Sequence, residues 1–518
     1  MYPFIGLIVL LPLIGSFTIP LVKLVAGSKK TTFLYASVVG LVVLLLTLYY
    51  TVMVYSEDQI IVYKAGGWPP PIGVAYIVDK PNMLLALVTS LIVLMIIAYS
   101  ADYIKDERYG WYLSLLLGNE AGLLVVILTG DYFHLFVGLE VTAVSAYALV
   151  MYYRHRGSAI VSALKYAFIG SLGTTLFLLA LSIMYNFYGT LNIIDFSLKI
   201  RGEAVSASGS ITPSAMIIPG LILALSYWTF SIKSGVFPNH FWLPDAHPAA
   251  PTPISALLSG LVVNTGVVAL YKLLYVGFAG EVPTSVTMVR DVVSLIVVIT
   301  GAVSGLIGAL LMSIQADVKR LIAYSTVMNT GLIFMGVGVL SKTGVEAFLF
   351  YTVTHSMAKS LMFLSAGILI KATGSRRINM LYGAGRAERI AGLAMVVATL
   401  TLSGIPPLPG FMAKLLLYQA LFEYNPIFAV LMILASTIAL VSYMRLMYVT
   451  VLEPQVAKVE KVGMAISKAV VVSLMVLVIL MGVLTLFSTE IFDIVFSTAA
   501  EQVGDVVKYL NQLKTQLV

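Results

Sequence analysis

The sequence predicts an all-α polytopic membrane protein with about fourteen transmembrane helices. Three observations lead to this class. First, 60% of the 518 residues are hydrophobic and 11% are charged, whereas soluble domains carry about 25% charged residues. Second, apolar segments of the roughly 20 residues that a span needs recur along the whole chain. Third, no polar stretch of about 50 residues, the size of a small soluble domain, separates them.

Fourteen apolar segments qualify as spans, and short polar loops separate them. The first has no basic residues ahead of its apolar run and no small-residue cleavage site, so we expect a span and not a removable signal. A last, more polar segment near 497–515 is amphipathic and is expected to lie along the membrane surface or against a partner. The predicted spans are 4–25, 32–55, 81–103, 111–129, 132–152, 159–187, 213–244, 251–277, 289–311, 320–340, 345–371, 388–422, 426–451 and 466–489.

Two of these segments are too long to be single straight spans. About 32 apolar residues would extend roughly 48 Å as a helix, against a hydrocarbon core of about 30 Å. Each contains an interruption, formed by Gly235 and Pro238 in the seventh segment and by the glycines and prolines of 404–410 in the twelfth. Such paired interruptions in two halves are typical of transporters built from inverted repeats.

The interruptions lie five spans apart, and an odd number of spans reverses the orientation of the second half. The sequence therefore predicts two inverted five-helix repeats with two broken helices. The expected organisation is 1–110 for spans 1–3, 111–278 for the first repeat (spans 4–8), 288–451 for the second repeat (spans 9–13), and 452–518 for span 14 with the C-terminal amphipathic segment.

The loops divide by charge. Loops after odd-numbered spans hold fifteen Lys and Arg residues, whereas loops after even-numbered spans hold six. Basic loops favour the cytoplasmic side. We therefore expect a multi-pass cell-membrane protein with its basic loops in the cytoplasm and both termini outside.

Charged residues inside the apolar segments are the candidate functional residues. Lys233 and Lys414 lie beside the two breaks, where proline removes backbone hydrogen bonds and a charged amine costs about 2.5–3.5 kcal/mol in hydrocarbon. Glu140 lies near the middle of span 5. A carboxylate beside a lysine couples the protonation of the two groups, which a proton relay can use. The alternative for Glu140 is a buried carboxyl without a transport role.

Further polar residues extend this set. Lys165 lies about two turns into span 6, where it either lines a pathway or snorkels to the basic side. His355 and Lys359 are four residues apart and share one helix face; they form either a relay or a buried pair that bonds neighbouring helices. His240, after the first break, is a candidate for carrying protons inward, whereas His247 is expected to be a structural hydrogen-bonding residue.

Several function classes are excluded or disfavoured. The chain has no cysteine, so it forms no disulfide, iron–sulfur cluster or thiolate metal site. Its five histidines show no metal-ligand spacing, and no glycine-rich phosphate loop follows a strand. We expect no cofactor, no metal and no nucleic-acid binding, because the net charge of +7 resides in short loops. Any redox chemistry would then belong to partner proteins.

Four motifs resemble one family. They are SIKSGVFPNHFWLPDAHPAAPTPISALLSG, DVKRLIAYSTVMNTG, HSMAK and SGIPPLPGFMAK. Together, and in this order, they resemble the large antiporter-like subunits shared by complex I, membrane-bound hydrogenase-type complexes and Mrp Na⁺/H⁺ antiporters. Within that family the chain most resembles the D-type component of Mrp antiporters. The resemblance covers nearly the whole chain and implies fourteen spans with two inverted five-span repeats.

The resemblance also implies roles for residues of this sequence, and one position departs from the family pattern. Many members carry a lysine in span 8, where this chain has Asn264. Because asparagine cannot hold the proton, either water bridges this point or the central connection differs. The implied roles are a span-5 glutamate for Glu140, a span-6 lysine for Lys165, a span-7 lysine for Lys233, a span-11 relay for His355 and Lys359, and a span-12 terminal group for Lys414.

The sequence thus predicts a protein that translocates protons, with sodium as a second candidate ion, within a multisubunit membrane complex. The alternative is a scaffold or membrane-arm component of a redox-driven oxidoreductase whose cofactors lie in other subunits. The chain itself offers no catalytic chemistry. Its partners would be other membrane subunits, and the parent complex is left open between an antiporter, a hydrogenase, a sulfur-reducing complex and a quinone-reducing complex.

Overall fold

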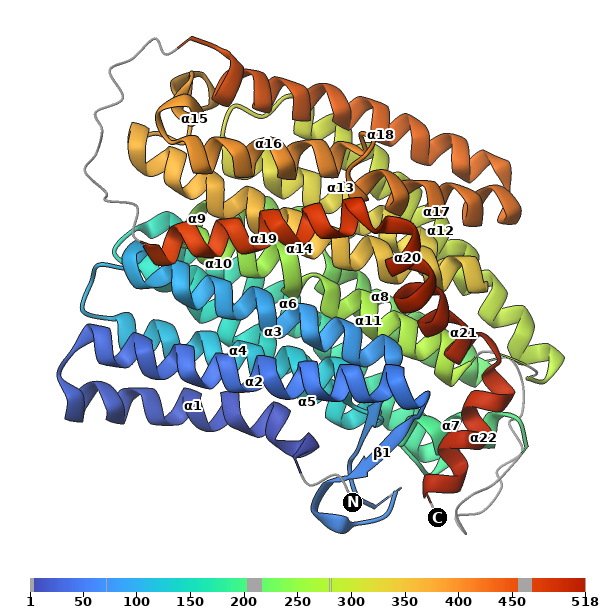
Figure 1. The fold of residues 1–518 in the computed structure, drawn as a ribbon. Helices are drawn as coiled ribbons and strands as arrows, with labels where there is room; N and C mark the ends of the chain where they lie inside the picture. Colours follow the sequence, from blue (N-terminus) through green and yellow to red (C-terminus); the bar gives the residue numbers. More distant parts are fainter. Residues whose placement is uncertain are drawn as a thin grey trace.

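A computed structural model describes residues 4–70, 72–202, 217–278, 280, 282–454 and 468–517. Long helices run side by side through the whole molecule (Figure 1). Eleven of the predicted spans are single long helices. They are α1 Ile5–Ala26, α2 Lys29–Glu57, α3 Lys80–Tyr103, α4 Tyr109–Leu128, α5 Tyr132–Val150, α6 Gly157–Tyr188, α12 Thr284–Ser313, α13 Val318–Gly338, α14 Lys342–Thr373, α18 Pro426–Met447 and α19 Lys468–Leu486.

The other three spans are composite. Within the described residues, thirteen helical segments are long and apolar enough to cross a membrane, and the broken pair α16–α17 completes the predicted fourteen. The all-α polytopic prediction is therefore confirmed. Span 7 consists of α8 Ile217–Ser234, η3 Asn239–Trp242 and α9 Leu243–Ala249; span 8 of α10 Thr252–Leu257, η4 Leu258–Val262, α11 Asn264–Tyr271 and η5 Lys272–Gly277; and span 12 of α16 Arg389–Ser403 and α17 Pro409–Tyr424.

The two predicted breaks share a local sequence pattern, Ser-Gly followed by a proline within three residues. Helix α8 ends at Ser234 and is followed by Gly235 with φ of 62°, and α16 ends at Ser403 and is followed by Gly404 with φ of 78°. Glycine adopts this left-handed conformation without a steric penalty, and it commonly ends helices. A cis X–Pro bond follows each glycine, at Phe237–Pro238 and Pro406–Pro407. Both broken helices are thus observed, whereas the repeat boundaries stay predictions.

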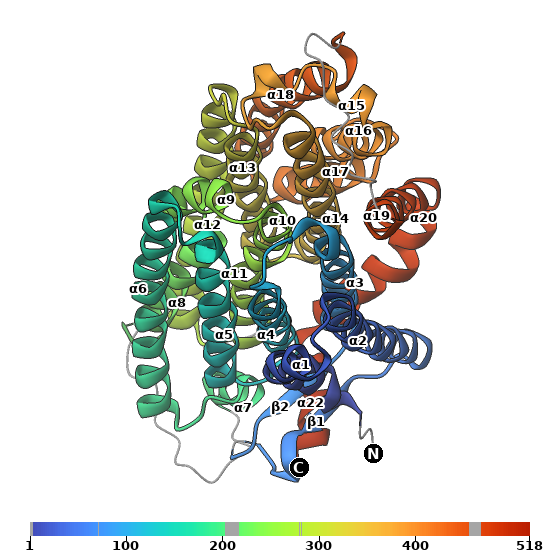
Figure 2. The ribbon, with the colours of Figure 1, turned by 90° about the vertical axis from the view of Figure 1, so that its left-hand side faces the viewer.

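The two halves occupy different parts of the bundle. Viewed end on, α4, α5, α6 and α11 lie together on one side, and α13, α16, α17 and α18 lie together on the other (Figure 2). Span 11, which is α14, packs against α10 and η4 of span 8. This contact brings span 8 of the first half directly against span 11 of the second half. Buried polar residues of both spans lie along it.

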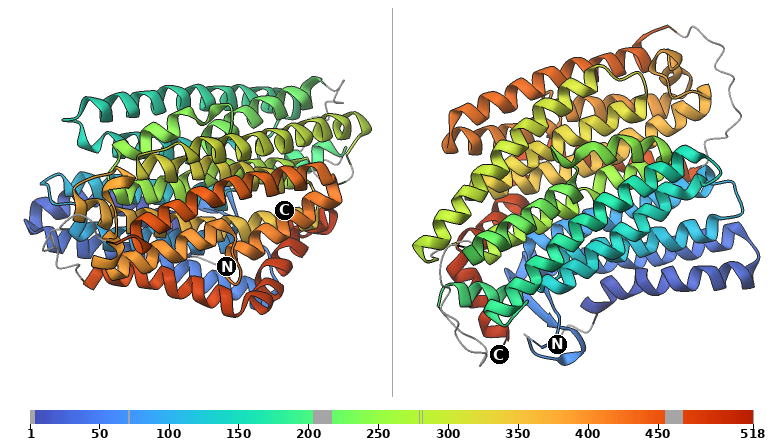
Figure 3. Two further views of the ribbon diagram at one scale, coloured as in Figure 1. Left: turned by 90° about the horizontal axis from the view of Figure 1, so that it is seen from above. Right: turned by 180° about the vertical axis from the view of Figure 1, so that it is seen from behind.

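One end of the bundle carries structure that the sequence did not predict. Strands β1 Ile61–Lys64 and β2 Ala75–Val78 form an antiparallel hairpin in which Ile61 pairs with Val78. The hairpin, the short helix α7 Ile193–Ile200 and the C-terminal helix α22 Val506–Leu517 lie at the same end as the N-terminus (Figures 1 and 3). We call this end the hairpin face. The opposite end, which carries α9 and α15 Ala384–Ala387, is the basic face.

The predicted amphipathic segment near 497–515 packs on the protein itself. It forms α21 Thr498–Gly504 and α22, after α20 Ser488–Ile491 and η8 Phe492–Ser497. The Gln516 side chain bonds both the backbone N–H of Val62 and the carbonyl of Ile60, which joins α22 to the hairpin. Parts of two predicted spans, 213–216 and 466–467, lie outside the described residues. So do Lys458 and Lys461, which belong to the basic-loop count.

Candidate functional site

The first group of site residues lies at the break in span 7. Lys233 is the second-last residue of α8 and is buried, with 4% of its surface exposed. Its Nζ lies 3.8 Å from Oε1 of Glu140 on α5, which is an ion pair too long for a direct hydrogen bond. Among the described residues, neither atom has a hydrogen-bond partner. The structure therefore brings together the two residues that the sequence placed in one relay.

The break beside Lys233 is held by packing. The indole Nε1 of Trp242 donates to the carbonyl of Ile232 at 3.0 Å, which satisfies a backbone group near the end of α8. The same indole stacks on Tyr166 of α6, with ring centroids 3.9 Å apart. Because lipid cannot hydrogen-bond freed backbone groups, these contacts allow a helix to stop within the bundle.

Lys165 and His240 lie away from this ion pair. The Nζ of Lys165 is 2.6 Å from Oδ2 of Asp245 on α9, and 41% of its side chain is exposed. Arg320 reaches the other oxygen of the same carboxylate at 3.8 Å. His240 in η3 is partly buried, and its ring lies 5.7 Å from that of Phe237. The structure does not place Lys165 in contact with Glu140 or Lys233, and the transport roles of Lys165 and His240 stay predictions.

Asn264 connects the two halves. It begins α11, directly after the π-helical turn η4, and such turns are frequent at functional sites. Its Nδ2 donates to the carbonyl of Gly260 and to Oγ of Ser356 on α14, both at 2.8 Å. Ser356 is the neighbour of His355 in the sequence. The position that departs from the family pattern is therefore a hydrogen-bonded contact between span 8 and span 11.

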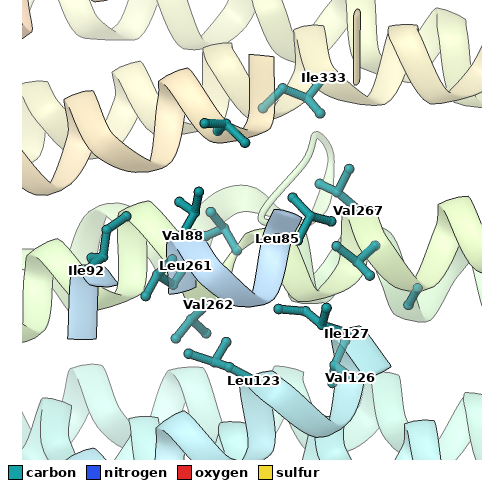
Figure 4. Close-up of a cluster of buried hydrophobic side chains, with 14 of the residues drawn as sticks. Leu85, Val88, Ile92, Leu123, Val126, Ile127, Leu261, Val262, Val267 and Ile333 are labelled. Atoms are coloured by element: carbon teal, nitrogen blue, oxygen red, sulfur yellow. The ribbon is translucent and has the colours of Figure 1, made fainter. Parts of the chain in front are cut away.

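A cavity of about 20 Å³ lies beside Asn264. Oδ1 of Asn264 and Oγ1 of Thr352 have no hydrogen-bond partner among the described residues, and both residues line this cavity. A single water needs about 10–15 Å³ and two to four polar partners. The cavity has that room, so a bridging water fits the geometry. The remaining walls are largely apolar: Leu85 and Val88 of α3, Leu123, Val126 and Ile127 of α4, and Leu261 of η4 (Figure 4).

His355 and Lys359 are fully buried on α14. Nζ of Lys359 donates to Oγ of Ser325 and, at 3.2 Å, to the carbonyl of Ile322, both on α13. Neither ring nitrogen of His355 has a partner among the described residues. The ring of His247 stacks on Phe363 of α14 at 4.8 Å. Neither of its ring nitrogens has a partner in the described chain, so its predicted hydrogen-bonding role stays a prediction, and the observed contact of the ring is aromatic packing.

Lys414 lies in the second turn of α17, directly beyond the second break. Its Nζ donates at 3.0 Å to the carbonyl of Ser403, the last residue of α16. The lysine side chain passes over Gly404, where an added Cβ would come within 2.7 Å of its Cδ. Lys414 also borders an open cavity of about 370 Å³ between span 12 and α18, together with Tyr418 and Ser436. Lys414 thus bonds a carbonyl that the helix break leaves free, and its side chain borders an open cavity at the side of span 12.

The sequence analysis missed several buried charged residues, among them Glu120 and Lys319. Glu120 in the middle of α4 is 0% exposed, and neither carboxylate oxygen has a hydrogen-bond partner among the described residues. Glu120 meets the criterion that selected Glu140, which was an acid in the middle of an apolar segment. The sequence alone could therefore have identified it. Lys319 was counted as a loop residue, but it is buried and donates at 2.8 Å to the carbonyl of Ala250, directly after α9. Its ammonium thus provides a hydrogen-bond donor for a backbone carbonyl at the end of the first broken helix.

The fold and the site together define a class: polytopic membrane proteins with interrupted helices and a row of buried charged residues between them. The chain belongs to the family described as NADH:quinone oxidoreductase/Mrp antiporter, TM, whose model matches residues 129–442. The matched region includes both breaks and every predicted site residue from Glu140 to Lys414.

Known relatives cover most of the chain. It is 30% identical over 389 residues to the N-type component of the NADH-quinone oxidoreductase of Desulforudis audaxviator, covering 74% of each chain. It is 28% identical over 520 residues to the D-type component of the Na⁺/H⁺ antiporter of Alkalihalophilus pseudofirmus, covering 98% of each. Among solved structures, a chain of the membrane-bound sulfane sulfur reductase, an archaeal respiratory membrane complex, matches with a TM-score of 0.87 and 27% identity. That match covers 98% of this chain and 99% of the other.

Proposed function

We propose that this protein is an antiporter-like, ion-translocating subunit of a multisubunit membrane complex and that it moves protons along a row of buried side chains. In the first half, the row consists of Glu140 and Lys233. It continues through Asn264 to His355 and Lys359, and it ends at Lys414. Sodium exchange coupled to this movement belongs to the same proposal, either in this chain or in a neighbouring one.

The ion pair of Glu140 and Lys233 is the observation that carries this proposal. Two opposite charges 3.8 Å apart, beside a helix break and without further hydrogen-bond partners in the described chain, are poorly stabilised as a structural pair. A buried ion pair repays its desolvation only when additional hydrogen bonds satisfy both groups. A pair that lacks them is suited to opening and closing, and each opening changes the charge that the next group in the row senses.

The sidedness of this row is part of the proposal. The excess of Lys and Arg in the loops after odd-numbered spans supports a cytoplasmic basic face and an outer hairpin face. His240 lies in η3, between the break and α9 of the basic face, which suits inward proton transfer to Lys233. Lys165 lies toward the same side, where its ion pair with Asp245 sets it apart from the row.

The test is Glu140→Gln in the native membrane complex. Glutamine is nearly isosteric but cannot cycle a proton, so we expect ion transport in membrane vesicles to fall by about tenfold or more, while the complex still assembles. Glu423→Gln is the matched control, because this carboxylate bonds Thr343 in an exposed contact. Full transport by Glu140→Gln would remove Glu140 from the mechanism.

A second candidate function has a specific observation in its favour. The likeness to a chain of the sulfane sulfur reductase spans nearly the whole length of both chains. This chain would then be a membrane-arm component of a redox-driven oxidoreductase whose cofactors lie in other subunits. Identification of the subunits that co-purify with it separates the two functions, because iron–sulfur partners indicate the redox-driven complex and their absence indicates an antiporter.

A further inference from the structure

A second buried charged group lies at the hairpin face, outside the row described above. Lys272 in η5, Asp79 before α3 and Tyr509 on α22 are each at most 3% exposed. The Tyr509 hydroxyl donates to Oδ2 of Asp79 at 2.6 Å, and Nζ of Lys272 donates to the carbonyl of Thr129 at 2.7 Å. Three segments that are far apart in the sequence therefore bury one acid and one amine together at the end of the membrane span.

Lys272 and Asp79 line a common cavity of about 10 Å³, which also includes Asn82, Thr129 and Tyr509. This volume is about what one water molecule requires. The ammonium of Lys272 donates to a backbone carbonyl, and the amine and the carboxyl residue both border the cavity. Burial raises the pKa of the Asp79 carboxyl, whereas its hydrogen bonds from Tyr509 and Asn82 act in the opposite direction.

This cavity and the cavity beside Asn264 lie along the same seam between three elements. Asn264 and Lys272 are eight residues apart in span 8, which corresponds to about 12 Å along a helix. The walls of the cavity beside Asn264 are largely apolar, and several of these side chains are labelled in Figure 4. The two cavities share no lining residue. The seam is lined by Asp79, Asn82, Leu85, Val88 and Thr89 of the α3 strip, by Leu123, Val126, Ile127 and Thr129 of the α4 strip, and by Asn264, Thr265, Val268 and Lys272 of span 8.

We propose that this seam is a proton branch that runs from Asn264 to the hairpin face, and that Lys272, Asp79 and Tyr509 form its outer gate. The proposal rests on the proposed function, because it requires protons to reach Asn264. In the observed state the two cavities are separate, and the stretch between them acts as a closed constriction of the kind that gates channels. Lys272 and Asp79 then exchange protons through the cavity water, and Tyr509 covers that water from the outside.

Anchoring of the C-terminal segment does not require this arrangement. Gln502 accepts from the backbone N–H of Lys80 at 2.9 Å, Tyr55 donates to the carbonyl of Val495 at 3.0 Å, and Gln516 bonds the hairpin. These contacts are neutral and hold the segment at three other points. A phenol placed on a buried carboxylate that borders the same cavity as a buried amine is a different kind of contact, and it offers groups that can exchange protons.

The absence of native cysteines allows a direct test of access. Val276 lines the outer cavity and is 4% exposed. A Val276→Cys variant of the full complex is treated with a small, charged, membrane-impermeant thiosulfonate reagent, in right-side-out and in inverted vesicles. We expect modification from the hairpin side only, and modification about tenfold faster when Tyr509→Phe removes the hydrogen bond to a charged group. Tyr55→Phe is the matched control, because it removes a tyrosine hydroxyl that anchors the same segment away from the cavity.

Transport measurements complete the test. Lys272→Gln is expected to reduce transport by about tenfold, as expected for the loss of a positioned proton-transfer group. Wild-type transport by an assembled Lys272→Gln complex would overturn the gate while leaving the proposed function in place, provided that Glu140→Gln is inactive. If Lys272→Gln does not assemble, the labelling decides. Equal modification rates in the Tyr509→Phe and Tyr55→Phe backgrounds, or no modification of Val276→Cys from the hairpin side, would also overturn the gate.

Discussion

The two broken helices place a lysine in different surroundings, although both breaks begin with Ser-Gly and a cis proline. Lys233, before the first break, faces the Glu140 carboxylate at 3.8 Å. Lys414, after the second break, bonds the Ser403 carbonyl at 3.0 Å, and no carboxylate lies within 4 Å of it among the described residues. The charge of the first lysine can therefore be balanced by the Glu140 carboxylate. The charge of the second lysine lacks such a partner and is removed only when the amine loses its proton.

Access to the two lysines differs as well. The break at Lys233 is filled by the stacked rings of Trp242 and Tyr166, whereas Lys414 borders an open cavity of about 370 Å³. A closed, paired site is suited to switching the charge seen by its neighbours. An open, unpaired site is suited to loading or releasing a proton. We infer that the two halves divide these tasks, and the following predictions test that division.

The largest effect is expected for Lys414→Arg. Arginine keeps the positive charge but does not release its proton, so we expect proton pumping in proteoliposomes to fall by about tenfold or more, as it should for Lys414→Ala. Lys342→Arg is the matched control, because Lys342 is half-exposed and pairs with Glu501 at 2.8 Å. Near-normal pumping by Lys414→Arg would show a fixed charge at this position. The terminal proton site would then have to be sought at Lys359 and His355.

The sequence predicted the spans and breaks well because apolar length and Gly/Pro interruptions are local properties. The hairpin was missed because strands of four residues leave too short a pattern in a mostly apolar chain. Lys165 shows a different limit. Its depth along span 6 was predictable, but its direction toward Asp245 depends on how α9 folds back after the break. The surroundings of Lys272, near the end of predicted span 8, were not predictable for the same reason, because Asp79 and Tyr509 come from distant segments.

An intermediate effect is expected for Asn264→Leu, which tests whether the two halves communicate through span 8. Leucine has a similar size but leaves the Gly260 carbonyl and the Ser356 hydroxyl without their shared donor, and it removes the polar wall of the cavity. A buried polar group left unsatisfied costs about 1–3 kcal/mol of stability. The hydrogen-bonded link between span 8 and span 11 is also lost, and a coupling free energy of about 1 kcal/mol corresponds to about fivefold, so we expect transport to fall by about fivefold. The measurement is proton transport per assembled complex.

The matched control for this prediction is Asn119→Leu. Asn119 is also fully buried and donates at 2.8 Å to the carbonyl of Thr142, but both residues belong to the first half. Its loss should lower thermal stability by a similar amount without uncoupling the halves. Equal losses of transport in the two variants would mean that Asn264 contributes only packing and hydrogen bonding.

The smallest effect is expected for Lys165→Met, which tests whether every lysine implied by the family pattern belongs to the row. Lys165 is 41% exposed and pairs with Asp245, and exposed ion pairs contribute only about 0–1 kcal/mol. Methionine keeps much of the aliphatic length of the side chain, and Asp245 retains Arg320 at 3.8 Å, so no uncompensated carboxylate remains. We therefore expect transport to stay within about twofold of wild type, since such a pair carries little energy.

The control for Lys165→Met is its combination with Arg320→Met. The double variant removes both cations from Asp245 and should lower complex stability more than either change alone. A loss of transport by Lys165→Met as large as that of Glu140→Gln, with assembly intact, would place Lys165 in the row after all. The first half would then contribute two lysines to the row, Lys165 and Lys233. It would differ from span 12, with its single Lys414, in the number of lysines as well as in the presence of a paired carboxylate.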